Sequence, residues 1–156
     1  MDDRRIRILV ASGILAAVIF VLTAFLRVPI PAGYLHLGDT GVFFAAMLLP
    51  PGVAVLCAGL GSALADLIGF PVYVPVTFLV KGLAALTFSL LWQRRDRLRY
   101  LAFLAILVIP VGYFLFELIL FRNYAWIDLP LNLLQSAVGA GLAFALDRAG
   151  RDRIRL

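Results

Sequence analysis

Residues 37–68, LGDTGVFFAAMLLPPGVAVLCAGLGSALADLI, contain no lysine or arginine and are interrupted by Pro50, Pro51 and Gly52. Two prolines followed by a glycine are typical of a tight turn between helices, because proline ends a helix and glycine permits the turn. We therefore expect one short helix over about 37–49 and a second over 52–68. A re-entrant hairpin that never crosses the bilayer completely stays open as an alternative, since a full crossing needs about 20 apolar residues.

The composition of the whole chain indicates an integral membrane protein. Of its 156 residues 63% are hydrophobic and 15% are charged, and the mean hydropathy is +1.03. A soluble domain of this length could not bury so much apolar surface. We expect an all-α fold in which residues 1–156 form a single membrane domain.

Four further apolar runs complete a prediction of six transmembrane helices. They cover about residues 6–26, 74–93, 100–121 and 128–147. The uncharged run at 8–26 is longer than the apolar core of a cleavable signal peptide, which is typically about 7–15 residues, so we interpret it as a retained first span.

The positions of the basic residues predict the orientation in the membrane. With six spans, both termini and the 94–99 loop share one side, and this side holds eleven of the fourteen basic residues: Arg4, Arg5, Arg7, Arg94, Arg95, Arg97, Arg99, Arg148, Arg151, Arg153 and Arg155. The other side has Arg27 and Arg122, while Lys81 lies within a span. Positively charged loops stay on the cytoplasmic side, so both termini are expected on the cytoplasmic side of the inner (cytoplasmic) membrane. The net charge of +5 then reflects loop bias and does not support nucleic-acid binding.

Residues suited to catalysis or metal binding are scarce in this chain. One cysteine, Cys57, lies in an apolar run, and one histidine, His36, lies in a predicted loop, so neither a disulfide nor a Cys/His metal cluster can form within the chain. No nucleophile–base pair is evident, and no glycine-rich phosphate loop is present. We predict no enzymatic activity and no cofactor.

Polar residues inside the predicted spans lie in the halves nearest the outside. Three helices each carry two polar residues three or four positions apart, which places each pair on one helix face. These pairs are Thr77 and Lys81, Tyr113 and Glu117, and Asn132 and Gln135. Intramembrane polar groups usually face a cavity or a partner, so we predict a polar pocket that opens outward above an apolar plug.

The predicted substrate-binding residues combine these pairs with polar residues of the predicted 27–36 loop and of the helix ends. They are Tyr34, His36, Asp39, Tyr73, Thr77, Lys81, Tyr113, Glu117, Asn132 and Gln135. Structural alternatives stay open for several of these polar residues. Asp66 could cap its helix or pair with Lys81, and Glu117 could pair with Lys81 too. Lys81 could instead reach the outer surface, Asn132 and Gln135 could bond neighbouring helices, and Tyr34 and His36 could be interfacial anchors. Asp128 is interpreted as the N-cap of the last helix rather than as a ligand.

The first helix carries two pairs of small residues four positions apart, Ser12 with Ala16 and Gly13 with Ala17. Small residues at this spacing allow another helix to approach closely. The pattern is compatible with packing inside the bundle or with a face for another subunit.

At this point the sequence resembles the substrate-binding S components of energy-coupling factor (ECF) vitamin transporters, in the riboflavin or thiamine-precursor branch. The resemblance is carried by RVPIPAGYLHLGDTGVFFAAMLLPPG (27–52), GLGSALADLIGFPVYVPVTFLVKGLAAL (59–86) and LPLNLLQSAVG (129–139). It implies a six-helix subunit that captures a vitamin or precursor from outside, with the first loop as a lid. A thiamine-precursor pyrimidine and riboflavin are the best candidate substrates, and pantothenate is a further candidate.

The resemblance also implies partners. S components join a membrane coupling subunit, the T component, and two cytoplasmic ATPases, and they are thought to topple in the membrane to release substrate. The coupling contact would fall on the small residues of the first helix, Ser12, Gly13, Ala16 and Ala17. As an alternative function, a proton-coupled transporter using Asp66, Lys81 and Glu117 is disfavoured by the small size and the absence of an internal repeat.

Overall fold

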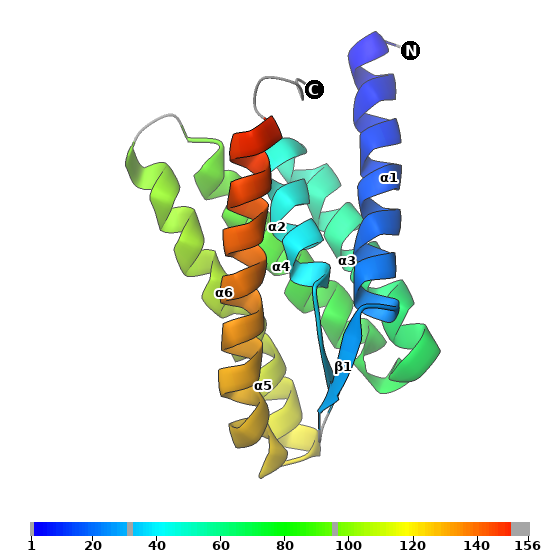
Figure 1. The fold of residues 1–156 in the computed structure, drawn as a ribbon, viewed down its shortest axis with the longest axis vertical. Helices are drawn as coiled ribbons and strands as arrows, with labels where there is room; N and C mark the ends of the chain where they lie inside the picture. Colours follow the sequence, from blue (N-terminus) through cyan, green and yellow to red (C-terminus); the bar gives the residue numbers. More distant parts are fainter. Residues whose placement is uncertain (1, 31–32, 95–96, 151–156) are drawn as a thin grey trace.

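The computed structural model describes residues 2–30, 33–94 and 97–150, so that Arg95, Arg151, Arg153 and Arg155 lie outside the described residues. Within this part the chain is almost entirely helical, which confirms that the fold is all-α (Figure 1). The α-helices are α1 (Asp3–Ala24), α2 (Gly38–Leu48), α3 (Pro51–Gly69), α4 (Val74–Trp92), α5 (Val108–Leu120) and α6 (Tyr124–Gly150). Two 3₁₀ segments, η1 (Pro71–Tyr73) and η2 (Arg97–Leu107), precede α4 and α5.

Five of the helical segments are long and apolar enough to cross a bilayer, and α2 is the exception. Its 11 residues rise about 16 Å, roughly half the thickness of a bilayer core. The turn between α2 and α3 lies at Pro50, as the two prolines predicted. The start of α1 and the ends of α4 and α6 lie at one end of the bundle (Figure 1). The basic segments attached to these ends therefore share one end of the molecule.

A two-stranded antiparallel hairpin, β1 (Arg27–Ile30) and β2 (Gly33–His36), connects α1 to α2. The sequence predicts only a polar loop there. Each strand has four residues and β1 contains Pro29, which pairs with Tyr34 across the hairpin. Such short strands give too little alternation to be recognised from sequence. In Figure 1 the hairpin reaches from the start of α2 toward the end of the bundle opposite the termini.

The α-helix predicted over 100–121 begins later, at Val108, and the residues before it are 3₁₀. Pro110 supplies a physical reason, because it has no N–H to donate and its ring crowds the carbonyl four residues earlier. The last helix, by contrast, begins earlier than predicted. It starts at Tyr124 instead of 128, so Asp128 lies inside α6 and the predicted N-cap role is wrong.

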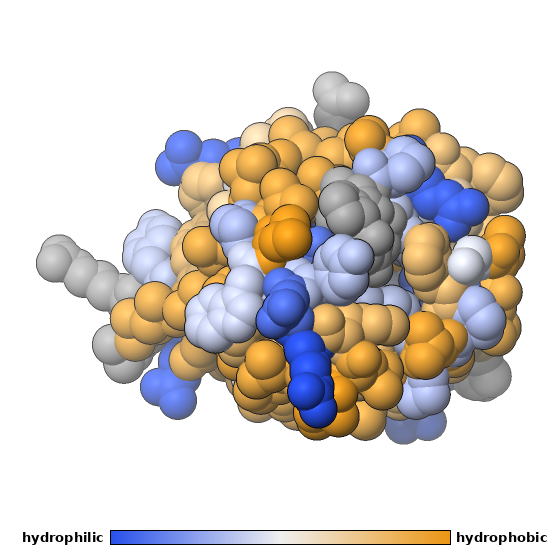
Figure 2. All heavy atoms as spheres, turned by 90° about the horizontal axis from the view of Figure 1, so that it is seen from below, coloured by the Kyte–Doolittle hydropathy of each residue, from blue (hydrophilic) through white to orange (hydrophobic). Residues whose placement is uncertain are grey.

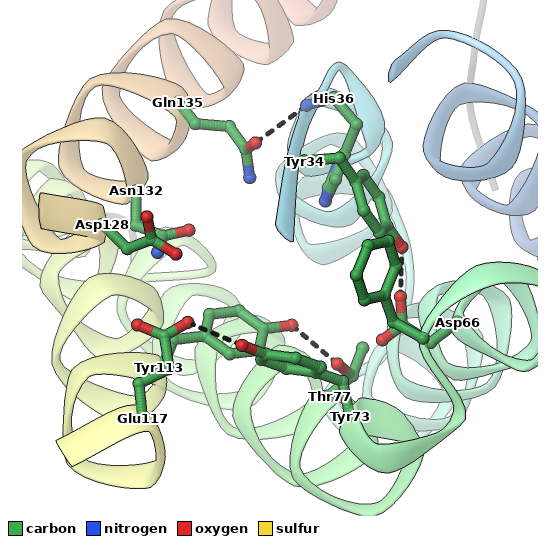
Figure 3. Close-up of a pocket in the computed structure, with 11 residues that line it drawn as sticks. Tyr34, His36, Asp66, Tyr73, Thr77, Tyr113, Glu117, Asp128, Asn132 and Gln135 are labelled. Carbon is green, nitrogen blue, oxygen red and sulfur yellow. Dashed lines mark hydrogen bonds between the residues drawn. The ribbon is translucent and has the colours of Figure 1, made fainter. Parts of the chain in front are cut away.

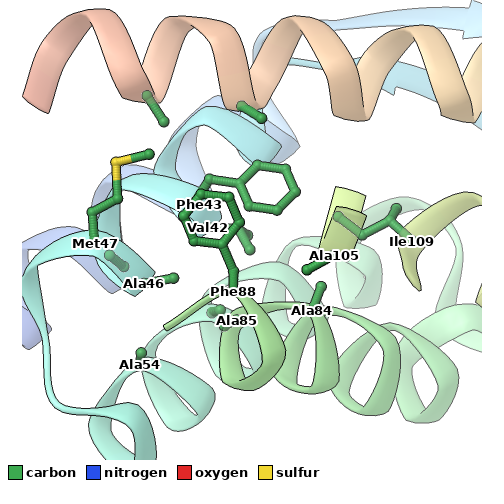
Figure 4. Close-up of a cluster of buried hydrophobic side chains, with 14 of the residues drawn as sticks. Val42, Phe43, Ala46, Met47, Ala54, Ala84, Ala85, Phe88, Ala105 and Ile109 are labelled. Atoms are coloured by element: carbon green, nitrogen blue, oxygen red, sulfur yellow. The ribbon is translucent and has the colours of Figure 1, made fainter. Parts of the chain in front are cut away.

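The apolar core lies between α2, α3, α4, η2, α5 and α6 (Figure 4). The Phe43 and Phe88 rings pack with their centroids 5.1 Å apart, and alanines such as Ala46 and Ala84 allow the helices to approach. Most of these residues lie nearer the end of the bundle that carries the termini than the residues lining the polar cavity do. This arrangement agrees with the predicted apolar plug.

α1 packs along one edge of the bundle against α2 and α3 (Figure 1). A Cβ atom on Gly61 of α3 would lie 2.7 Å from the carbonyl oxygen of Ala16, so glycine is needed for this close approach. The Cys57 thiol donates to the Ser12 carbonyl at 3.4 Å. Ser12 and Ala16 therefore lie on the α3 side of α1, whereas Gly13 and Ala17 are exposed.

Candidate functional site

A cavity opens at the hairpin end of the bundle and encloses about 420 Å³ of empty space, including its open mouth. Figure 2 views this end of the molecule, where hydrophilic atoms gather near the middle of a largely apolar face. Side chains from the hairpin and from five helical segments surround the cavity (Figure 3). They are Tyr34, His36, Asp66, Phe70, Tyr73, Thr77, Tyr113, Glu117, Asp128, Asn132 and Gln135.

Eight of the ten predicted binding residues line this cavity: Tyr34, His36, Tyr73, Thr77, Tyr113, Glu117, Asn132 and Gln135. Helical spacing was the signal for Thr77, Tyr113, Glu117, Asn132 and Gln135, because residues three or four apart lie on one face. Thr77 and Tyr113, on facing helices, are hydrogen-bonded at 2.9 Å. The Tyr73 hydroxyl donates to Oε1 of Glu117 at 3.3 Å.

Asp39 and Lys81, the other two predicted binding residues, are not among the residues that line the cavity. They form an ion pair in which both side chains are buried. The partner of Lys81 is thus Asp39, and the sequence alternatives that paired Lys81 with Asp66 or Glu117 are wrong in this structure. Lys81 Nζ also lies 5.2 Å from the centroid of the Tyr113 ring, which lines the cavity.

Asp39 links the ion pair to the cavity wall. Its second carboxylate oxygen accepts hydrogen bonds from Gln135 Nε2 at 3.1 Å and from Ser136 Oγ at 3.3 Å. Oε1 of Gln135 in turn accepts the backbone N–H of His36 at 2.8 Å. One buried polar network therefore joins α2, α4, α6 and the hairpin, and it fixes the orientation of Gln135.

The hairpin forms one wall of the cavity through Tyr34. The Tyr34 hydroxyl donates to Asp66 on α3, and its ring lies 5.2 Å from the Phe70 ring and 5.2 Å from the Arg27 guanidinium. Burial, and then the neighbouring Asp66 carboxylate, raises the pKa of Tyr34, so the hydroxyl remains a donor. These contacts tie the hairpin to α3, on the side of the cavity opposite Gln135.

Three lining residues, Asp66, Phe70 and Asp128, were not among the predicted binding residues. Asp128 has the same signal as its neighbours, because Asn132 and Gln135 follow at four and seven positions on the same helix face. A helix that begins at 128 predicts an N-cap role for Asp128, and for this reason the sequence does not mark it as a lining residue. Phe70 lies between α3 and η1, where neither polarity nor periodicity marks it.

The state of His36 gives a testable pH dependence. Burial, and then the positive charge of Lys81, lowers the pKa of His36 from 6.5 to about 4, so Nδ1 is free to accept the Gly38 N–H at 3.0 Å. The unfolded chain binds more protons between these two values, so the free energy of unfolding falls as pH is lowered through this window. We expect the melting temperature of the wild type to fall more between pH 6.5 and 4 than that of His36→Asn.

Asparagine suits this comparison because its side-chain oxygen can still accept the N–H two residues ahead, yet it does not titrate. Melting temperatures of both purified proteins, recorded in detergent across the same pH series, test the prediction. Parallel curves for the two proteins would show that His36 is not protonated in this window.

Both the sequence and the fold of the chain are similar to those of known proteins. The model of a family described as ECF-type riboflavin transporter, S component, matches residues 4–149. An "Uncharacterized protein in gap 3'region" of Pyrococcus woesei is 45% identical over 64 residues, and the match spans 40% of this chain and 43% of that relative. A solved S component of a bacterial ECF transporter has the same fold, with a TM-score of 0.71, 19% identity, and coverage of 95% of this chain and 97% of that one.

Proposed function

The chain belongs to the ECF-type riboflavin transporter S component family, and from this premise we propose that it captures a vitamin or vitamin precursor in the cavity beneath the hairpin. The observation that supports this most directly is the polar cavity at one end of an apolar bundle. The apolar layer below it favours a binding site over a continuous conduit, and it disfavours a proton-coupled transporter.

The walls of the cavity suit a flat, polar ring such as a thiamine-precursor pyrimidine or riboflavin. Tyr34, Tyr73 and Tyr113 supply aromatic surface, and Asn132 and Gln135 offer both donors and acceptors. In this proposal the hairpin is a lid held by Tyr34 and His36. Asp39 and Lys81 act from below, by holding Gln135 in place.

We further propose that the chain crosses the cytoplasmic membrane six times, with the short α2 as the second crossing and the hairpin on the outer side. Both termini are then cytoplasmic, and the cavity opens outward. Energy would come from a T component and two ATPases, because the sequence has no phosphate-binding loop. The exposed Gly13 and Ala17 face of α1 is the proposed contact with the T component.

Small-molecule mass spectrometry of the purified protein tests the proposed capture. We expect one vitamin or precursor per chain to be retained or bound in the absence of ATP. Asn132→Leu should lose it, whereas Leu133→Ile, a matched control on the exposed side of α6, should keep it. The proposal is wrong if monodisperse wild-type protein retains nothing and binds neither riboflavin nor the pyrimidine.

A further inference from the structure

The charge of the cavity lining is one-sided. Three carboxyl groups, those of Asp66, Glu117 and Asp128, line the cavity, and none of its lining residues is lysine or arginine. Two basic residues lie near the cavity but outside its lining. Lys81 is paired with Asp39, and the guanidinium of Arg27 lies over the Tyr34 ring. Asp66 accepts the Tyr34 hydroxyl, and Arg27 lies over the same tyrosine ring, so the carboxyl groups without a neighbouring cation are those of Glu117 and Asp128.

Glu117 and Asp128 each carry an oxygen atom with no donor. Their exposed fractions are 3% and 1%, and Glu117 Oε2 and Asp128 Oδ1 have no hydrogen-bond partner within the part of the chain that the structure describes. They come from adjacent helices, α5 and α6, and both point toward the cavity (Figure 3). A buried carboxylate oxygen without a donor is costly, so these two oxygens indicate donors that arrive with the ligand.

Aromatic rings form the wall between these carboxylates and the lid. The Tyr34 and Phe70 centroids are 5.2 Å apart, those of Phe70 and Tyr73 6.3 Å, and those of Tyr73 and Tyr113 6.2 Å. The faces of such rings are electronegative and attract cations as well as stacking on flat rings. The same cavity thus offers a surface for a ring and two acceptors for its positive edge.

We propose that the ligand is a flat nitrogen heteroaromatic that carries a positive charge, with N–H groups directed at Glu117 and Asp128. The inference rests on the proposed function, since it takes the cavity as the substrate site. It narrows the substrate class, because an anionic vitamin would find no free cation in the lining and a neutral ring would leave the carboxylates uncompensated.

A pair of ligands that differ only in charge tests the inference on the wild-type protein. The first is a methylaminopyrimidine carrying a neutral hydroxymethyl group, and the second is the same ring carrying a protonated aminomethyl group. Thiamine, with its fixed positive charge, and its neutral tricyclic derivative thiochrome form a second pair. By calorimetry, we expect at least one cation to bind roughly tenfold or more tightly than its neutral partner.

Two charge-neutral variants locate the effect. Glu117→Gln and Asp128→Asn keep the size of each side chain, and they should remove most of the cation's advantage while leaving the neutral ligand's affinity nearly unchanged. Asp3→Asn, an exposed carboxylate at the far end of α1, is the matched control and should keep the advantage. Because the ligand pairs are compared on wild-type protein first, a variant that fails to fold does not remove the test.

The possible failures are distinguishable. If riboflavin or another neutral ligand binds more tightly than every cation, and the two variants leave this preference unchanged, the charge inference is overturned while vitamin capture stands. Tight binding of anionic pantothenate overturns the inference in the same way. If no probe binds and no small molecule is retained, both the inference and the proposed function fail.

Discussion

Replacement of Lys81 by alanine is expected to destabilise the whole protein, not merely to weaken ligand binding. Lys81 and Asp39 are both completely buried and neutralise each other, so Lys81→Ala leaves an uncompensated carboxylate among α2, α4 and α6. Breaking a buried ion pair from one side typically costs about 3–5 kcal/mol. We expect the melting temperature in detergent to fall by about 10 °C or more, with loss of the monodisperse species.

A matched double variant separates the cost of the orphaned charge from the loss of the lysine itself. Asp39→Asn combined with Lys81→Met removes both charges at similar volume, and replacement of a whole buried pair is often close to neutral. The double variant should therefore recover most of the lost melting temperature. It should still bind ligand more weakly than the wild type, since Gln135 loses its charged acceptor.

A different result would restore the role predicted from sequence for Lys81. If Lys81→Ala folds and melts like the wild type but loses ligand affinity by an order of magnitude, then Lys81 contacts substrate directly. Size-exclusion chromatography, thermal melting and calorimetry on the same preparation distinguish the two outcomes.

The helices were accessible from sequence because lipid exposure imposes long apolar runs bounded by charges or turn residues. Pro50 and Pro51 marked the turn between α2 and α3 correctly, and spacings of three and four residues marked five of the eight predicted binding residues that line the cavity. Each of these signals is local along the chain. The polar residues on the different helices were expected to lie at similar depths in the membrane, and this common depth is what predicted a shared site.

The features that sequence missed depend on contacts between distant segments. Lys81 had acidic residues in other helices at comparable depth, and only the packing of α2 against α4 and α6 selects Asp39. The hairpin is held by Tyr34 on Asp66 and by Gln135 on the His36 backbone, contacts that span 32 and 99 residues. No pattern within a short window contains such information.

The two small-residue pairs of α1 show how the structure resolved an ambiguity. Both pairs have the spacing that permits close helix contact, and sequence could not choose between internal packing and an external partner. Ser12 and Ala16 lie on the side of α1 that packs against α3. Gly13 and Ala17 are exposed, and a Cβ atom on Gly13 would meet nothing within 4 Å.

Enlarging the exposed pair is therefore expected to abolish assembly and transport while sparing capture. Gly13→Leu combined with Ala17→Leu adds bulk only to the outer face of α1, where Leu9, Val10 and Ile14 are already exposed. The altered face can no longer admit a closely packed helix of the proposed T component. We expect co-purification with the T component and ATPases, and vitamin uptake by cells, to fall to background.

Ligand affinity and melting temperature of the isolated double variant should match the wild type, because no internal contact of the described bundle changes. The control on the inner side is Gly61→Leu, whose side chain would collide with Ala16 and Ile19 and should lower the melting temperature of the subunit alone. Loss of ligand binding in the Gly13 and Ala17 variant would show that this face packs internally. Undiminished assembly would instead place the T component contact on another helix, because an interface built on Gly13 and Ala17 could not accommodate two leucines at the same helix separation.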